Sequence, residues 1–96
     1  YICRPVIHGN TIYLATIWSG DGSEGTGFVS ILNEQDKLVS APGGCAPIYE
    51  GDKLNPMYQT LKVFHHPHDV CVDDDENLYV AQWNSGKTYP IKLYRV

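Results

Sequence analysis

The apolar and polar residues along the chain follow the two-residue period that is typical of β-strands. Short runs rich in β-branched and aromatic residues are separated by clusters of Gly, Asn, Asp and Ser, as in strands joined by turns. Six runs are predicted to be strands: 11–18, 28–32, 37–41, 69–72, 77–83 and 90–96. The first three are expected to form an antiparallel meander. No segment has a convincing helical period, so the predicted fold class is all-β.

The segment 42–66 interrupts this pattern. It contains three prolines and three glycines and has no clean period. We predict a long connection here, with one helical turn near 57–62. Connections of this length are unusual inside compact domains, and they often carry function or a binding edge.

The chain contains an internal repeat, because residues 10–20 align without gaps with residues 76–86. The matched pairs include Ile12 with Leu78, Tyr13 with Tyr79, Leu14 with Val80 and Ala15 with Ala81. A repeating unit of three or four strands favours a β-propeller over a sandwich.

The second half of the chain resembles a repeat of the NHL type. The motif has a Pro-His start, a short apolar strand, an acidic turn that ends in Asn, and a strand of the form Leu-Tyr-Val-Ala. The residues that match it are Pro67, His68, Asp69, Val70, Val72, Asp73, Asn77, Leu78, Tyr79, Val80 and Ala81. The first half is less similar, since Cys3, Arg4 and Pro5 stand where the motif has Pro-His-Asp.

This resemblance implies a β-propeller, commonly six-bladed, with four antiparallel strands in each blade. It divides the chain into a first blade (1–41), a long connecting loop (42–66) and an incomplete second blade (67–96) that lacks its outer strand. A free strand edge and bare blade faces promote association, and two blades bury little core. We therefore expect a C-terminal segment of a larger propeller, or a chain that assembles with other copies.

Size and charge narrow the possible partners. The 96 residues suffice for one small domain. A net charge of −4 with only seven Lys and Arg argues against nucleic acid or an anionic membrane surface as the partner. No apolar run approaches the roughly 20 residues of a membrane span, so membrane insertion is not expected. The chain starts at Tyr1, which suggests a processed, trimmed or excerpted chain, and an extracellular or periplasmic location is expected.

The three cysteines, Cys3, Cys45 and Cys71, have no paired spacing. Their odd number fits either one disulfide with one free thiol or three buried thiols. Cys71 lies between two valines and is predicted to be a small buried apolar residue. No serine lies in a nucleophile-elbow motif, so the sequence indicates no catalytic triad.

Histidines gather at 65–68, next to Asp69. Neutral imidazole is a good ligand for zinc or copper, and on a regular strand His66 and His68 would point the same way. NHL-like propellers include the peptidyl-α-hydroxyglycine amidating lyase, in which histidines at blade starts hold a channel zinc and an adjacent Asp helps to hold calcium. That resemblance implies zinc at His68 and calcium at Asp69, and His66 is a further candidate ligand because of its place on the same strand face as His68. The alternative is that His68 caps its strand and Asp69 bonds the backbone of a neighbouring blade.

Three further features have plain interpretations beside functional ones. The acidic run 73–76 lacks the Gly of an EF-hand and is predicted to be a solvated turn that Asp73 caps. The Gly-rich run 19–27 lacks the Gly-Lys-Ser/Thr of a phosphate-binding loop and is predicted to be a flexible loop. Trp18 and Trp83, near strand ends, are either packing residues or a platform for sugars or peptides.

Together these features favour a binding or assembly module that is a segment of an NHL-like propeller. Its expected partner is the remainder of the propeller or other copies of the chain. One alternative is a part of a lyase or hydrolase that depends on zinc or calcium and has its active site in the channel. The other is an extracellular structural protein that assembles by strand addition.

Overall fold

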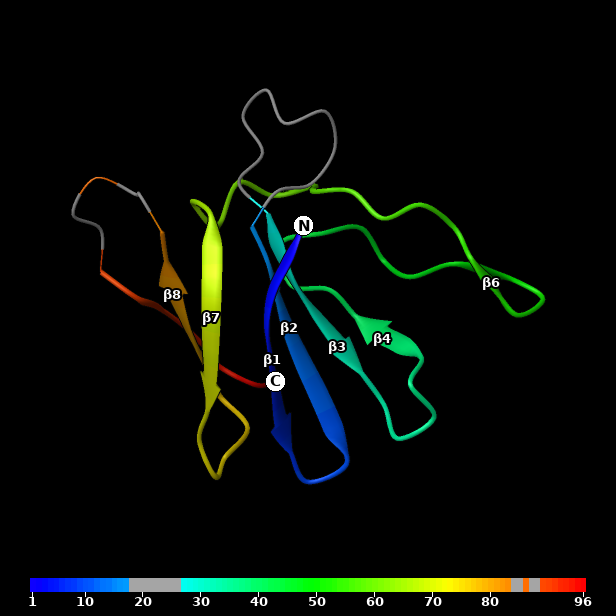
Figure 1. The fold of residues 1–96 in the computed structure, drawn as a ribbon, viewed down its shortest axis with the longest axis horizontal. Coiled ribbons are helices and arrows are strands. Elements are labelled where there is room, and N and C mark those ends of the chain that lie inside the picture. Colours follow the sequence, from blue (N-terminus) through cyan, green and yellow to red (C-terminus); the bar gives the residue numbers. More distant parts are fainter. Residues whose placement is uncertain (18–26, 84–85, 87–88) are drawn as a thin grey trace.

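The computed structural model describes residues 1–17, 27–83, 86 and 89–96, which form antiparallel sheets (Figure 1). The first sheet contains, in spatial order, β1 (Ile2–His8), β2 (Thr11–Thr16), β3 (Phe28–Leu32) and β4 (Leu38–Ser40). The second sheet contains β7 (Pro67–Val72), β8 (Leu78–Gln82) and β9 (Ile91–Leu93), also in chain order. A separate hairpin pairs β5 (Tyr49–Glu50) with β6 (Lys53–Leu54). No helix occurs among the described residues, which confirms the all-β prediction.

Each of the six predicted strands overlaps one of the observed strands, and both large sheets are antiparallel meanders, as predicted. The strand β1 was not among the predicted runs. The range 28–32 is reproduced residue for residue as β3. The other strands begin or end one to three residues away from the predicted bounds, as is usual where turns and strand ends fray. Trp18, the last residue of the predicted strand 11–18, lies outside the described residues.

Two hairpins, one in each sheet, are closed by the same five-residue turn. In the first sheet the Asn33 side chain accepts hydrogen bonds from the backbone N–H of Gln35 and of Lys37, both at 3.0 Å. In the second sheet Asp73 Oδ1 accepts from the N–H of Asp75 at 3.0 Å and of Asn77 at 2.8 Å. The fourth residue of each turn has a positive φ, 59° at Asp36 and 63° at Glu76. Asn and Asp favour such turns because their short side chains bond the backbone two residues on. The prediction that Asp73 caps the acidic run is therefore confirmed.

The first and second sheets pack face to face, with β7 lying beside β1 (Figure 1). The buried cluster between them consists of Tyr13, Val29, Phe64, Val70, Leu78 and Val80. Alternation places these residues on facing sides of the two sheets, because successive side chains of a strand point to opposite faces. Burial of each large apolar side chain contributes about 1.5–3 kcal/mol, so this cluster is the main stabilising feature of the chain.

Residues 42–66, here called the arm, run outward from the end of the first sheet and return to β7 (Figure 1). The outgoing and returning parts bond each other, from Cys45 N to Tyr58 O at 2.9 Å and from Thr60 N to Gly43 O at 3.0 Å. The predicted helical turn near 57–62 is wrong, because these backbone groups bond across the arm instead of along a helix.

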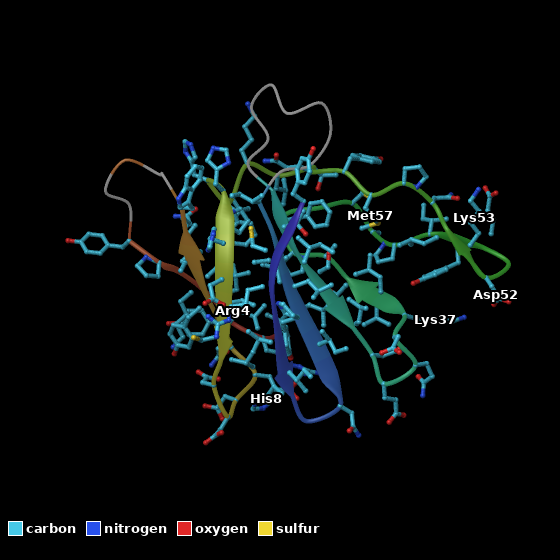
Figure 2. The ribbon with its side chains drawn as sticks, in the orientation of Figure 1. Arg4, His8, Lys37, Asp52, Lys53 and Met57 are labelled. Carbon is cyan, nitrogen blue, oxygen red and sulfur yellow. The ribbon has the colours of Figure 1, made fainter. Side chains whose placement is uncertain are left out.

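The arm is fixed to the sheets near its tip and at its returning end. Near its tip, the Tyr49 hydroxyl donates to the carbonyl of Leu38 at 2.9 Å, and Lys37 lies 3.5 Å from Asp52 (Figure 2). At its returning end, Phe64 is 2% exposed and belongs to the buried cluster. The arm is therefore a packed part of the fold rather than a loose connection.

Candidate functional site

The histidine-rich segment lies at the start of β7 but does not form one regular strand. His66 precedes the strand and has a φ of +58°, which is the left-handed region. A bulge then breaks the register between Pro67 and Asp69, since Pro67 pairs with Gln82 and Asp69 with Ala81. The prediction that His66 and His68 share a strand face therefore does not hold, because it assumed an unbroken two-residue period.

The individual side chains of this segment have separate surroundings. His66 Nδ1 lies 3.4 Å from the carbonyl oxygen of Ile17, and its ring meets the ring of Trp83 edge-on, with centroids 6.3 Å apart. His68 is exposed at the bulge. Asp69 Oδ1 accepts the backbone N–H of Val70 at 2.8 Å, which uses one of its oxygens locally.

The other carboxylate oxygen of Asp69 faces the first sheet. Arg4 Nη1 of β1 lies 3.5 Å from Asp69 Oδ2, and Figure 2 shows Arg4 reaching toward β7. This ion pair links β1 and β7, the first strands of the two sheets. The Arg4 side chain is 69% exposed, so the pair contributes at most about 1 kcal/mol.

The predicted metal ligands His66, His68 and Asp69 are close in sequence, but the structure does not turn them toward a common point. Across the described part of the chain, no three His, Cys, Asp or Glu side chains gather closely enough to share a metal ion. His8 lies at the far end of β1, away from the start of β7 (Figure 2). A zinc or calcium at His68 and Asp69 would therefore need further ligands from outside these residues.

The acidic turn is held by hydrogen bonds within the chain. Asp73 Oδ2 accepts from the side-chain amide of Asn77 and from the Tyr79 hydroxyl, both at 3.1 Å. Desolvation of the Asp73 carboxyl opposes its ionisation, but the bonds from Asn77, Tyr79 and Asp75 outweigh it and lower the pKa below 3.8. Together with the backbone bonds these contacts make Asp73 a structural acceptor.

All three cysteines are free. Cys3 and Cys45 are half-buried and Cys71 is exposed, so neither the disulfide nor the three buried thiols of the sequence analysis is found. The prediction that Cys71 is buried is wrong because Val70 and Val72 face the first sheet, which turns Cys71 to the opposite side.

Trp83, one of the two predicted ligand-binding tryptophans, stands at the end of β8 and is 49% exposed. Its backbone N–H donates to the carbonyl of His66 at 2.8 Å, which joins the two strand ends. The indole lies outside the buried cluster and is accessible beside the His66 ring.

The two copies of the internal repeat bury opposite faces. Tyr13 and Ala15 of β2 are 4% and 0% exposed, whereas the aligned Tyr79 is 37% exposed and Ala81 is also exposed. The other face of the repeat shows the reverse, since Leu78 and Val80 of β8 are buried and the aligned Ile12 and Leu14 are only half-buried. The first sheet therefore buries the repeat face that contains Tyr13 and Ala15, and the second sheet buries the opposite repeat face, which contains Leu78 and Val80. Each sheet leaves exposed the repeat face that the other sheet buries.

The open side of the second sheet is here called the outer face. It includes Cys71, Tyr79, Ala81 and Lys92, all of which are exposed, and the half-buried Asp69 pairs with Ala81 across the strands. The Lys92 ammonium lies over the rings of Tyr79 and Tyr94, 5.1 and 4.6 Å from their centroids. A hydrogen bond with Tyr79 raises the pKa of Lys92, so this face carries a fixed positive charge on an aromatic surface.

The open side of the first sheet is here called the receiving face. It consists of Pro5, Ile7, Ile12 and Leu14, which cross-strand pairing places together. Ile7, near the end of the edge strand β1, is 72% exposed. The receiving face is therefore an exposed apolar surface, and the outer face combines exposed aromatic rings with a lysine. Exposed apolar patches mark interaction sites.

Comparison with protein-family models, with curated proteins and with solved structures finds no match to this chain. Nothing in the described ranges forms a helix with the length and hydropathy of a bilayer span.

Proposed function

We propose that the chain is an assembly module whose sheets stack head to tail, outer face against receiving face. The observation that carries this proposal is the opposite burial of the two repeat copies. In the contact between the two sheets, the Tyr13 face of the first repeat copy packs against the Leu78 and Val80 face of the second copy. A contact of this kind can be repeated, because each sheet keeps one unused face.

The side chains at the contact between the two sheets support the proposal that the outer face can pack against a further sheet. Ala15 is fully buried on the same strand face as Tyr13 of the contact, and its counterpart Ala81 on the outer face is equally small. A small residue lets the two sheets approach to about 10 Å, the usual spacing of stacked sheets. The outer face can therefore accept the same neighbour that the face of Tyr13 and Ala15 accepts.

The partner in this proposal is a further blade-like sheet, from the remainder of an NHL-like propeller or from other copies of the chain. The finer expectations follow from the resemblance and stay predictions: an extracellular or periplasmic location, a closed propeller of about six blades, and a metal at His68. The assembly proposal does not depend on them.

The test is the mass of the full 96-residue chain in solution, measured by sedimentation equilibrium over a range of concentrations. We expect self-association that Ala81→Arg abolishes, since a long charged side chain on the outer face prevents close approach. Ala46→Arg is the matched control, because Ala46 is an exposed alanine on the arm. A well-folded chain that stays monomeric at every concentration would contradict the proposal.

A mixing experiment tests the head-to-tail direction. Ile7→Arg blocks the receiving face and leaves the outer face intact, whereas Ala81→Arg does the reverse. Each variant alone should be monomeric, and an equimolar mixture should form a one-to-one dimer through the two intact faces. If the mixture stays monomeric while the wild type associates, the contact does not join these two faces.

A further inference from the structure

Two sulfur atoms meet across the arm, and we propose that they form a binding site for a soft monovalent metal ion, Cu(I). Cys45 Sγ of the outgoing part lies 3.7 Å from Met57 Sδ of the returning part, and Figure 2 shows Met57 between the two parts of the arm. Neither residue belongs to the outer face or the receiving face, so the site does not depend on the stacking of sheets.

The backbone of the arm holds the two sulfur-bearing residues together. The N–H of Cys45 donates to the carbonyl of Tyr58, the neighbour of Met57, at 2.9 Å. Toward the tip of the arm, the N–H of Asn55 donates to the carbonyl of Ile48, also at 2.9 Å. These bonds fix the separation of the two donors before any ion binds, and donors that are already ordered lose little entropy on binding.

Two prolines stiffen the chain beside the sulfur pair. Pro56 directly precedes Met57, and Pro47 follows Cys45 by two residues. A proline ring fixes φ near about −65°, so each part of the arm has fewer backbone conformations available to it. The sequence therefore favours the same arrangement that the cross-arm hydrogen bonds hold.

The separation of the two sulfurs suits a shared ion. With metal–sulfur bonds of about 2.3 Å, the length found for zinc thiolates, sulfurs 3.7 Å apart subtend an angle of about 107° at the ion. This angle is close to that of trigonal or tetrahedral coordination, so the side chains need not move far to bind. Cys45 and Met57 are both half-buried, so a small soluble ligand can reach the remaining coordination positions.

The chemistry of the donors selects Cu(I) over the commoner biological metals. A thiolate and a thioether are soft ligands that favour Cu(I), whereas calcium and magnesium take oxygen ligands. Structural zinc takes four protein ligands, and the described ranges bring together no three His, Cys, Asp or Glu side chains that could supply them. On binding, Cu(I) replaces the thiol proton of Cys45, and that proton passes to solvent.

The test is a competition for Cu(I) between the full 96-residue chain and the coloured chelator bicinchoninate, without oxygen and with ascorbate as the reductant. We expect the wild-type chain to remove Cu(I) from the chelator. Residues that only hydrogen-bond a metal ligand contribute about 10–100-fold to metal affinity, so loss of a ligand itself should cost at least tenfold. Cys45→Ser and Met57→Leu should therefore each weaken Cu(I) binding at least tenfold.

The controls separate a two-sulfur site from a single reactive thiol. Met57→Leu keeps the volume and the apolar character of the side chain, so the variant should fold, and circular dichroism checks that it does. Cys3→Ser and Cys71→Ser remove the other two free thiols and should leave Cu(I) binding unchanged.

Three results would overturn the proposal. The wild-type chain would fail to take Cu(I) from the chelator, or Met57→Leu would bind as tightly as the wild type, which would mean that the thiol acts alone. The third is a loss in Cys3→Ser or Cys71→Ser as large as the loss in Cys45→Ser, which would place the ion elsewhere.

Discussion

Replacement of Phe64 by Ala tests whether the arm is part of the core. The Phe64 ring is 2% exposed and lies in the buried cluster with residues of both sheets. It also lies against Gly43, where an added Cβ would stand 3.0 Å from two ring carbons. The site is therefore closed by backbone on one side and cannot readily collapse around a cavity.

The expected cost of this replacement is large. Removal of a buried Phe side chain typically costs about 3–5 kcal/mol, from lost burial and from the cavity left behind. The total stability of a small domain is only about 5–15 kcal/mol. Because about 1 kcal/mol shifts the thermal midpoint of such a domain by roughly 4–8 °C, Phe64→Ala should lower it by about 12 °C or more.

The assay is thermal unfolding followed by circular dichroism, with urea unfolding as a second measure. Leu61→Ala is the matched control, because Leu61 lies on the same arm but is 62% exposed and should change stability by less than about 0.5 kcal/mol. Equal midpoints for the two variants would refute the reasoning and would mean that the arm does not pack on the sheets.

Two further predictions concern the backbone and the acidic turn. Gly27→Ala should prevent stable folding, because the φ of Gly27 is +74° and a Cβ there would lie 1.9 Å from the carbonyl oxygen of Thr16. The control is Gly51→Ala, since Gly51 has a φ of +63° but open space around it. This control should lower the free energy of unfolding in urea by only about 1–2 kcal/mol. The low pKa of Asp73 stabilises the fold above pH 3.8, and this stabilisation is lost as the pH falls through the folded pKa. Asp73→Asn should therefore lower the thermal midpoint at pH 7, and its difference from wild type should be smaller near pH 2. The control Asp74→Asn should leave the thermal midpoint unchanged at both pH values. If Asp73→Asn lowers the midpoint equally at both pH values, ionisation of Asp73 is not the cause.

The strands were predictable because alternation and turn residues act locally. Predicted strand 28–32 and the cap at Asp73 required only neighbouring residues. The hairpin of β5 and β6 was missed, since two-residue strands carry no period. Its only sequence signal was Gly51 followed by Asp52 between Tyr49–Glu50 and Lys53–Leu54.

The candidate surfaces were harder to predict because they depend on which sheet face is covered. The sequence places Val70 and Val72 on one face and Cys71 on the other, but it does not say that the second face lies open. The bulge at the start of β7 separates His66 from His68, and bulges arise from register between strands rather than from one strand's sequence. A cleft of about 420 Å³, lined by residues that include Tyr13, Val39, Leu78 and Leu93, depends on the packing of two sheets from distant parts of the chain.

The five-residue turn that the two hairpins share makes their stability depend on pH to different degrees. One copy uses the neutral amide of Asn33 as its acceptor, and the other uses the carboxylate of Asp73. Protonation in acid removes the charge of the Asp73 carboxylate, whereas the Asn33 amide has no charge to lose. The five-residue turn is thus insensitive to pH in the first sheet and sensitive to pH in the second. Acid should therefore destabilise the hairpin of β7 and β8 before that of β3 and β4.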